Sequence, residues 1–104
     1  MIIAVDFDGT LCEYKNPGIG NPKLDVIKKV KELSKNNKII LWTSRKGYAL
    51  KQALKWCSQY DLKFDSVNKN INEIKTSRKI YADLYIDDKA INVYNFIKGD
   101  KYEN

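Results

Sequence analysis

The sequence predicts an α/β fold of the Rossmann-like kind, in which a mainly parallel sheet lies between helices. Apolar runs at residues 1–7 and 38–43 are typical of strands that are buried on both faces. Amphipathic stretches at residues 22–36 and 47–60 indicate helices that follow these strands. Strands that alternate with helices form parallel sheets. We therefore expect a three-layer αβα sandwich, with one domain over residues 1–104.

Local signals set the limits of the first two helices. Asn21 followed by Pro22 is typical of a helix N-terminus, with the Asn side chain as the cap. The first helix is expected to bury one apolar face, made of Leu24, Ile27, Val30 and Leu33. The second is expected to bury Leu50, Ala53, Leu54 and Cys57. Glycine and proline are frequent between residues 9 and 22, which indicates a loop.

The second half of the chain has weaker signals. The segment "FDSV" predicts a short strand, and the polar residues 68–79 predict a loop. The segment "ADLYID" predicts a further strand, and residues 91–97 a short helix. Residues 98–104 are expected to fray.

Composition excludes several classes of site. The chain has no histidine, and its two cysteines lack paired metal spacing, so the usual zinc sites and histidine-activated nucleophiles are not expected. The net charge of +6 indicates a solvated surface or an attraction to anions, and charge alone does not choose between them. No signal peptide or membrane span is evident, so we expect a cytoplasmic protein without a membrane partner.

Polar side chains follow three of the predicted strands. In parallel sheets, ligands bind beyond the carboxyl ends of the strands, so these side chains are expected at one edge. They are Asp6, Asp8, Thr43, Ser44, Asp87 and Asp88. Carboxylate oxygens without histidine or thiolate suit a hard cation, most plausibly Mg²⁺. A cation would relieve the repulsion between the crowded acids, so that one carboxylate can attack while a neighbour transfers protons.

Four segments, read in order, resemble the motifs of the haloacid dehalogenase (HAD) superfamily. They are "DFDGT", "IILWTS", "TSRKIYAD" and "YIDD". The resemblance covers nearly the whole chain and implies a HAD-like fold. It also implies a Mg²⁺-dependent phosphohydrolase that cleaves a phosphomonoester through an aspartyl-phosphate intermediate.

The resemblance assigns a role to each residue of these motifs. Asp6 is expected to be the nucleophile and a metal ligand. Asp8 is expected to be the general acid and base, with its backbone carbonyl on the metal. Asp88 is expected to bind the metal directly and Asp87 through water, although the two roles are open to reversal.

The same motifs suggest which residues bind the phosphoryl group. Thr43 is expected to hydrogen-bond its oxygens, unless the hydroxyl only caps the next turn. Lys79 is expected to steady the intermediate, with Lys75 as the substitute candidate. Ser44 and Arg45 are further candidates for substrate binding, and a helix cap and a surface arginine are the simpler interpretations.

The motif spacing leaves no room for a cap domain. Residues 11–21 are long enough only for a small flap. An open site suits a large phosphorylated partner, or a small substrate enclosed by a second copy in a homo-oligomer. Nucleotides, sugar phosphates and nucleic-acid ends are all candidate substrates. The alternative functions are a receiver-like signalling domain and a phosphate-binding module without turnover.

Overall fold

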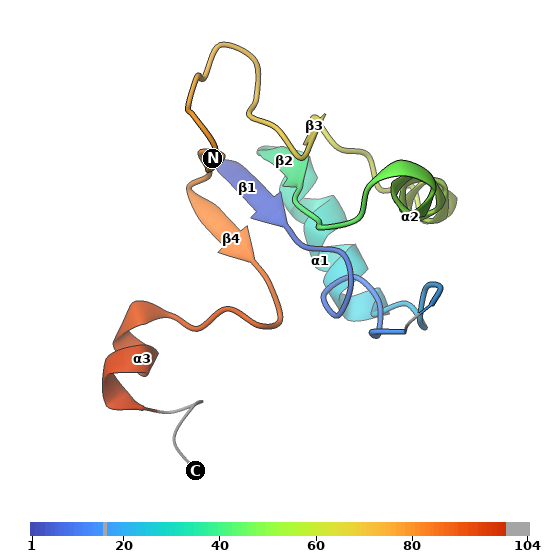
Figure 1. Cartoon of the computed structure of the whole chain (residues 1–104), viewed down its shortest axis with the longest axis horizontal. Helices are drawn as coiled ribbons and strands as arrows, with labels where there is room; N and C mark the ends of the chain where they lie inside the picture. Colours follow the sequence, from blue (N-terminus) through green and yellow to red (C-terminus); the bar gives the residue numbers. More distant parts are fainter. Residues whose placement is uncertain (16, 100–104) are drawn as a thin grey trace.

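The computed structural model describes residues 1–15 and 17–99 and contains a four-stranded parallel sheet in the order β3-β2-β1-β4 (Figure 1). The elements are β1 (Ile2–Val5), α1 (Leu24–Ser34), β2 (Lys38–Leu41), α2 (Gly47–Gln59), β3 (Ser66–Val67), β4 (Leu84–Ile86) and α3 (Val93–Lys98). The predicted α/β class and parallel sheet are therefore confirmed. Of residues 98–104, which were expected to fray, Lys98 is the last residue of α3 and Gly99 is its C-cap. Residues 100–104 lie outside the described residues.

The strands end in register at one edge of the sheet. Ala4 in β1 lies opposite Ile40 in β2 and Tyr85 in β4. Beyond the strands, the Trp42 N–H donates to the Val5 carbonyl at 2.9 Å, and the Asp6 N–H donates to the Ile86 carbonyl at 2.9 Å. These bonds keep the chain extended past the ends of β1, β2 and β4. The residues that follow these three strands are thus held side by side.

The two longer helices pack on the same face of the sheet. Side chains from alternate strand positions form one buried cluster with residues of both helices, namely Ile3, Val5, Ile39, Leu41, Ile27, Val30, Ala53 and Cys57. The intervening strand positions, Ala4 and Ile40, pack against Ile71, Ile80 and Ala82. These last residues belong to the loop between β3 and β4. The expected second helical layer is therefore a loop layer, because Ile71, Ile80 and Ala82 supply the apolar cover for that face.

Helix α1 begins later than the sequence predicts. Its N-cap is Lys23, without a side-chain capping bond, and its first residue is Leu24. The preceding residues are extended instead, because the Asn21 carbonyl accepts the Glu13 N–H at 2.7 Å and Pro22 forms an isolated bridge with Cys12. Leu24, expected in the core, is 63% exposed, and the buried face begins at Ile27.

Helix α3 lies apart from α1 and α2, beyond β4 (Figure 1). The Asn92 side chain accepts the Tyr94 N–H at 2.9 Å and caps its start, and Gly99 with φ of 80° ends it. None of its residues is buried. Within residues 1–15 and 17–99, no helix is long and apolar enough to cross a membrane.

Candidate active site

Three carboxylates meet at the carboxyl edge of the sheet. Asp6 follows β1, and Asp87 and Asp88 follow β4. One carboxylate oxygen of each residue lies within 4.8 Å of the corresponding oxygens of the other two. Asp6 is half-buried, whereas the other two are exposed. An all-oxygen donor set of this kind fits a hard cation such as Mg²⁺. The predicted strand-end carboxylates are thus brought together, and the order of Asp87 and Asp88 on a metal stays open.

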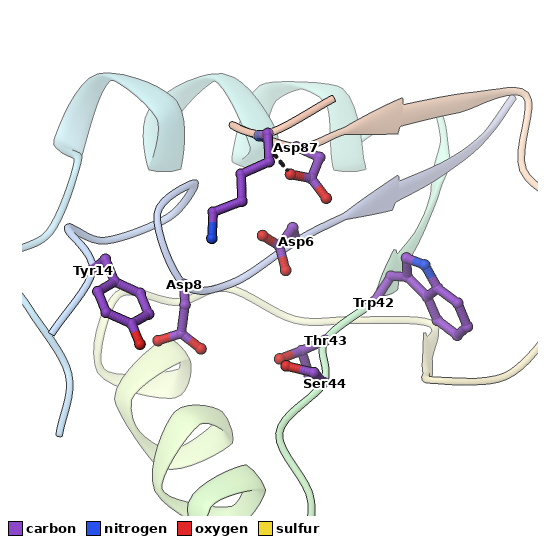
Figure 2. A pocket seen from close by; sticks show the side chains of 8 residues that line it. Asp6, Asp8, Tyr14, Trp42, Thr43, Ser44 and Asp87 are labelled. Atoms are coloured by element: carbon purple, nitrogen blue, oxygen red, sulfur yellow. Dashed lines mark hydrogen bonds between the residues drawn. The ribbon is translucent and has the colours of Figure 1, made fainter. Parts of the chain in front are cut away.

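A cavity of about 550 Å³ opens beside this cluster. Figure 2 shows Asp6 between Asp87 on one side and Thr43 and Ser44 on the other. The lining also includes Asp8, Tyr14, Trp42 and Lys89. The cavity thus places carboxylates opposite hydroxyl groups, with one lysine at its wall.

The pKa of Asp6 is raised from 3.8 to about 6, mainly by burial and also by the charges of Asp87, Asp88 and Asp8, although the backbone N–H of Phe7 lowers it. A carboxylate crowded by other acids gains from a bound cation, which favours its ionised form. The surroundings of Asp6 therefore favour the binding of a cation next to its carboxylate.

The raised pKa of Asp6 predicts a pH-dependent loss of stability in the metal-free protein. Folded Asp6 binds a proton more tightly than unfolded Asp6, whose ordinary pKa is 3.8. Its stabilisation is thus fully present below that value and is lost as the pH rises through about 6. We expect the free energy of unfolding to fall by about 1 kcal/mol over this pH range, after allowance for solvent screening. Urea unfolding with a chelator measures it, and Asp6→Asn should lack this contribution. An identical pH dependence in the two proteins would contradict the environment described for Asp6.

Two small residues of the "DFDGT" segment accommodate Asp88: Thr10 bonds to it, and Gly9 leaves room for its carboxylate. The Thr10 hydroxyl donates to Asp88 Oδ1 at 3.2 Å and accepts the Asp88 N–H at 3.0 Å, and Thr10 is 5% exposed. Gly9 has φ of +87°, and a Cβ added there would lie 2.7 Å from Asp88 Cγ. Thr10 and Gly9 thus shape the end of β4 at which the three carboxylates meet. Sequence reasoning gave them no role, although both belong to the motif it singled out.

Asp8 lies beside the three-carboxylate cluster and is paired with Arg45. Arg45 Nε donates to Asp8 Oδ2 at 2.8 Å, and Arg45 Nη2 donates to Asp8 Oδ1 at 2.8 Å. This pairing with Asp8 raises the pKa of Arg45 above its ordinary value. Arg45, a candidate for substrate binding, is therefore placed against a carboxylate of the site itself. The carboxylate of Asp8 is not part of the candidate metal cluster.

Thr43 and Ser44 both line the cavity opposite Asp6. The Thr43 N–H donates to Asn68 Oδ1 at 2.8 Å, and Thr43 Oγ1 accepts the Arg45 N–H at 3.1 Å. The hydroxyl therefore supports the turn after β2 while it faces the cavity. The Ser44 side chain does not cap α2, whose N-cap is Lys46 without a side-chain bond.

The structure separates the candidate lysines. Lys79 Nζ lies 5.6 Å from the ring centroid of Tyr85, and Lys79 lines an adjoining groove with Asp6 and Asp87. Lys75 is exposed and lines neither cavity. Lys89 lines the main cavity itself. Its position directly after Asp87 and Asp88 was the signal available in the sequence, and it was missed.

Comparison with known proteins identifies a family and a relative of known structure. Residues 3–103 match the family model of haloacid dehalogenase-like hydrolases. A conserved protein from Bacteroides thetaiotaomicron has a solved structure with 35% sequence identity and a TM-score of 0.80. The likeness covers 100% of this chain and 98% of that one. No functionally curated protein matches the chain.

Proposed function

The chain belongs to the haloacid dehalogenase-like hydrolase family, and on that premise we propose that it is a Mg²⁺-dependent phosphohydrolase that cleaves a phosphomonoester. The observation that carries the proposal is the cluster of Asp6, Asp87 and Asp88 at the edge of the sheet. Asp8 stands beside this cluster, and the hydroxyls of Thr43 and Ser44 stand across the cavity. This arrangement offers a nucleophile, a proton carrier and phosphate-binding donors in one place.

Asp6, Asp88 and Asp87 are the residues that would hold Mg²⁺, with the backbone carbonyl of Asp8 as a further ligand. When bound, the ion neutralises the crowded carboxylates and the charge of the phosphoryl group. Thr10 supports this role because it forms two hydrogen bonds with Asp88, and Gly9 leaves the space that the Asp88 carboxylate occupies.

The reaction proposed for these residues has two steps. In the first, an Asp6 oxygen attacks phosphorus, the bond to the leaving oxygen breaks, and Asp8 gives its proton to that oxygen. In the second, water attacks the phosphorus of the aspartyl-phosphate, Asp8 takes the proton from the water, and inorganic phosphate leaves. Asp8 ends the cycle protonated, and Asp6 ends it as a free carboxylate.

Donors around the cavity are proposed to bind the phosphoryl oxygens. The Thr43 and Ser44 hydroxyls lie across from Asp6 (Figure 2). Lys79 keeps its proposed role of steadying the intermediate, since it shares a groove with Asp6. Lys89 adds a second ammonium at the main cavity. Hydrogen bonds from charged donors are the stronger ones in such sites.

Replacing these lysines one at a time separates their roles. We expect Lys79→Gln to lower kcat by about a hundredfold, the usual cost of one charge-stabilising donor. Lys89→Gln should act mainly on KM, because this lysine lies at the cavity wall. Lys75→Gln is the matched control and should leave both constants unchanged. Steady-state kinetics of the three variants measures this, and a large loss only in the Lys75 variant would reverse the assignment.

The proposed function is tested by hydrolysis of a generic aryl phosphate with Mg²⁺ and with chelator. We expect turnover that disappears with chelator and returns with added Mg²⁺. A panel of nucleotides, sugar phosphates and phosphorylated nucleic-acid ends then defines the substrate, since the cavity is open to solvent in the described part of the chain. Phosphate binding without turnover on the whole panel would instead indicate a binding module.

A further inference from the structure

We propose that Arg45 is a positioning residue that fixes the carboxylate of Asp8 for proton transfer with the leaving group. The inference rests on the proposed function and adds a determinant to the same site. Asp8 alone among the site carboxylates is paired with a cation in the described part of the chain. Proton transfer needs its oxygens aimed within hydrogen-bond reach of the leaving oxygen, so whatever fixes their direction affects the rate.

The Arg45–Asp8 pair has a geometry that fixes direction. Two parallel N–H···O bonds of 2.8 Å join the guanidinium edge to both carboxylate oxygens. Such a two-pronged contact sets the plane of the carboxylate, which a single bond does not. The pair is also screened from water, since the side chains of Arg45 and Asp8 are 12% and 21% exposed. The Arg45 guanidinium carbon lies 5.2 Å from the ring centroid of the fully buried Phe7.

The guanidinium is itself held by three separate segments. Besides Asp8, Arg45 Nη2 donates to the Gly18 carbonyl at 2.6 Å, and Arg45 Nη1 donates to the Ala49 carbonyl at 3.4 Å. Gly18 belongs to the flap between β1 and α1, and Ala49 lies in the first turn of α2. With four of the five N–H groups of Arg45 engaged, little of the guanidinium is left for a substrate phosphate. Arg45 therefore acts through Asp8.

The pairing with Arg45 leaves a lone pair free on each oxygen of Asp8. A carboxylate oxygen has two lone pairs, and each Asp8 oxygen accepts one N–H from Arg45. Asp8 also lines the main cavity and a second, smaller cavity that Gly18 and Arg45 help to form. The leaving group of a substrate whose phosphorus faces Asp6 can thus reach Asp8 from the cavity.

A comparison of two substrates with different leaving groups tests the inference. An alkyl phosphate needs a proton on its leaving oxygen, whereas dinitrophenyl phosphate has a leaving group that departs without one. We expect Arg45→Gln to lower kcat/KM for the alkyl phosphate by about a hundredfold, the usual share of general acid catalysis. The loss for dinitrophenyl phosphate should be less than about threefold. The ratio of kcat/KM for the alkyl phosphate to kcat/KM for dinitrophenyl phosphate does not depend on the folded fraction of a variant, because both values scale with that fraction.

The controls use conservative and charge-matched substitutions. Arg45→Lys keeps the charge but not the two-pronged contact. Its ratio of kcat/KM for the two substrates should therefore lie between those of Arg45→Gln and the wild type. Arg78→Gln removes the only other arginine of the chain, which is exposed, and should leave the ratio unchanged. Equal losses for both substrates in Arg45→Gln would overturn the inference. They would leave the proposed function standing if the turnover of the wild type still requires Mg²⁺.

A stability measurement tests the pair without turnover. Urea midpoints of Asp8→Asn, Arg45→Gln and the double variant form a double-mutant cycle. If the two side chains act as one unit, the double variant should unfold at nearly the same midpoint as Arg45→Gln alone. Strictly additive shifts would show that the two side chains do not interact and would overturn the inference, whatever substrate the enzyme takes.

Discussion

Replacing Asp6 with asparagine is expected to lower kcat by at least about a thousandfold, the scale of loss when a nucleophile is removed. The amide of the new side chain cannot form the acyl-phosphate bond. The variant should remain folded, because burial and three neighbouring acids raise the pKa of Asp6 to about 6 and make its charge costly in the metal-free protein. Hydrolysis of an aryl phosphate with Mg²⁺, before and after the substitution, measures the effect.

Asp25→Asn is the matched control for this prediction. Asp25 is an exposed residue in the first turn of α1, and the exchange of its carboxyl group for an amide should leave kcat unchanged. If Asp6→Asn keeps the activity of the wild type, Asp6 is not the nucleophile. If both variants lose activity equally, the effect is one of charge and not of chemistry.

Gly9→Ala is expected to disrupt the proposed metal site and to lower Tm by about 10 °C. Gly9 has φ of +87°, a conformation that costs alanine about 1–2 kcal/mol. The added Cβ would also lie 2.7 Å from Asp88 Cγ and would push that carboxylate away from Asp6 and Asp87. We therefore expect Mg²⁺ affinity to fall at least about tenfold, since the position of one ligand is lost. Calorimetric titration with Mg²⁺ and thermal unfolding measure the two effects.

Gly47→Ala separates the strain from the collision. Gly47 also has a positive φ, of +57°, but nothing lies within 4 Å of a Cβ added there. This variant should lose stability through backbone strain alone and should bind Mg²⁺ as the wild type does. A Gly9→Ala variant with unchanged Mg²⁺ affinity would contradict the placement of Asp88 in the metal site.

The carboxylates of the site were predictable because apolar runs mark where buried strands end. The runs before Asp6 and Thr43 stop at the same edge of a parallel sheet, so the residues that follow them must meet. Asp87 and Asp88 follow the last predicted strand and were expected at the same edge for the same reason. Short-range patterns therefore sufficed for the three-carboxylate cluster and the facing hydroxyls.

The rest of the site depends on contacts that no local pattern encodes. Asp8 and Arg45 are 37 residues apart, and their pairing requires the flap and the first turn of α2 to converge on one guanidinium. Lys79 lies in a long loop without periodicity, so its distance from Asp6 is set by how Ile71 and Ile80 pack on the sheet. The same packing replaces the expected second helical layer. The Asp8–Arg45 pair, the position of Lys79 and the loop layer thus depend on tertiary contacts, which secondary-structure propensity and motif spacing do not predict.

The proposed reaction requires Asp6 to form a covalent phosphoryl intermediate. The most direct test quenches the enzyme with acid during turnover and reduces it with borohydride, which converts an aspartyl-phosphate to homoserine. Mass spectrometry of the peptides then locates the modified residue. We predict homoserine in place of Asp6 in the presence of Mg²⁺ and substrate, and none with chelator. Homoserine at another aspartate, or at none during measurable turnover, would contradict the proposed mechanism.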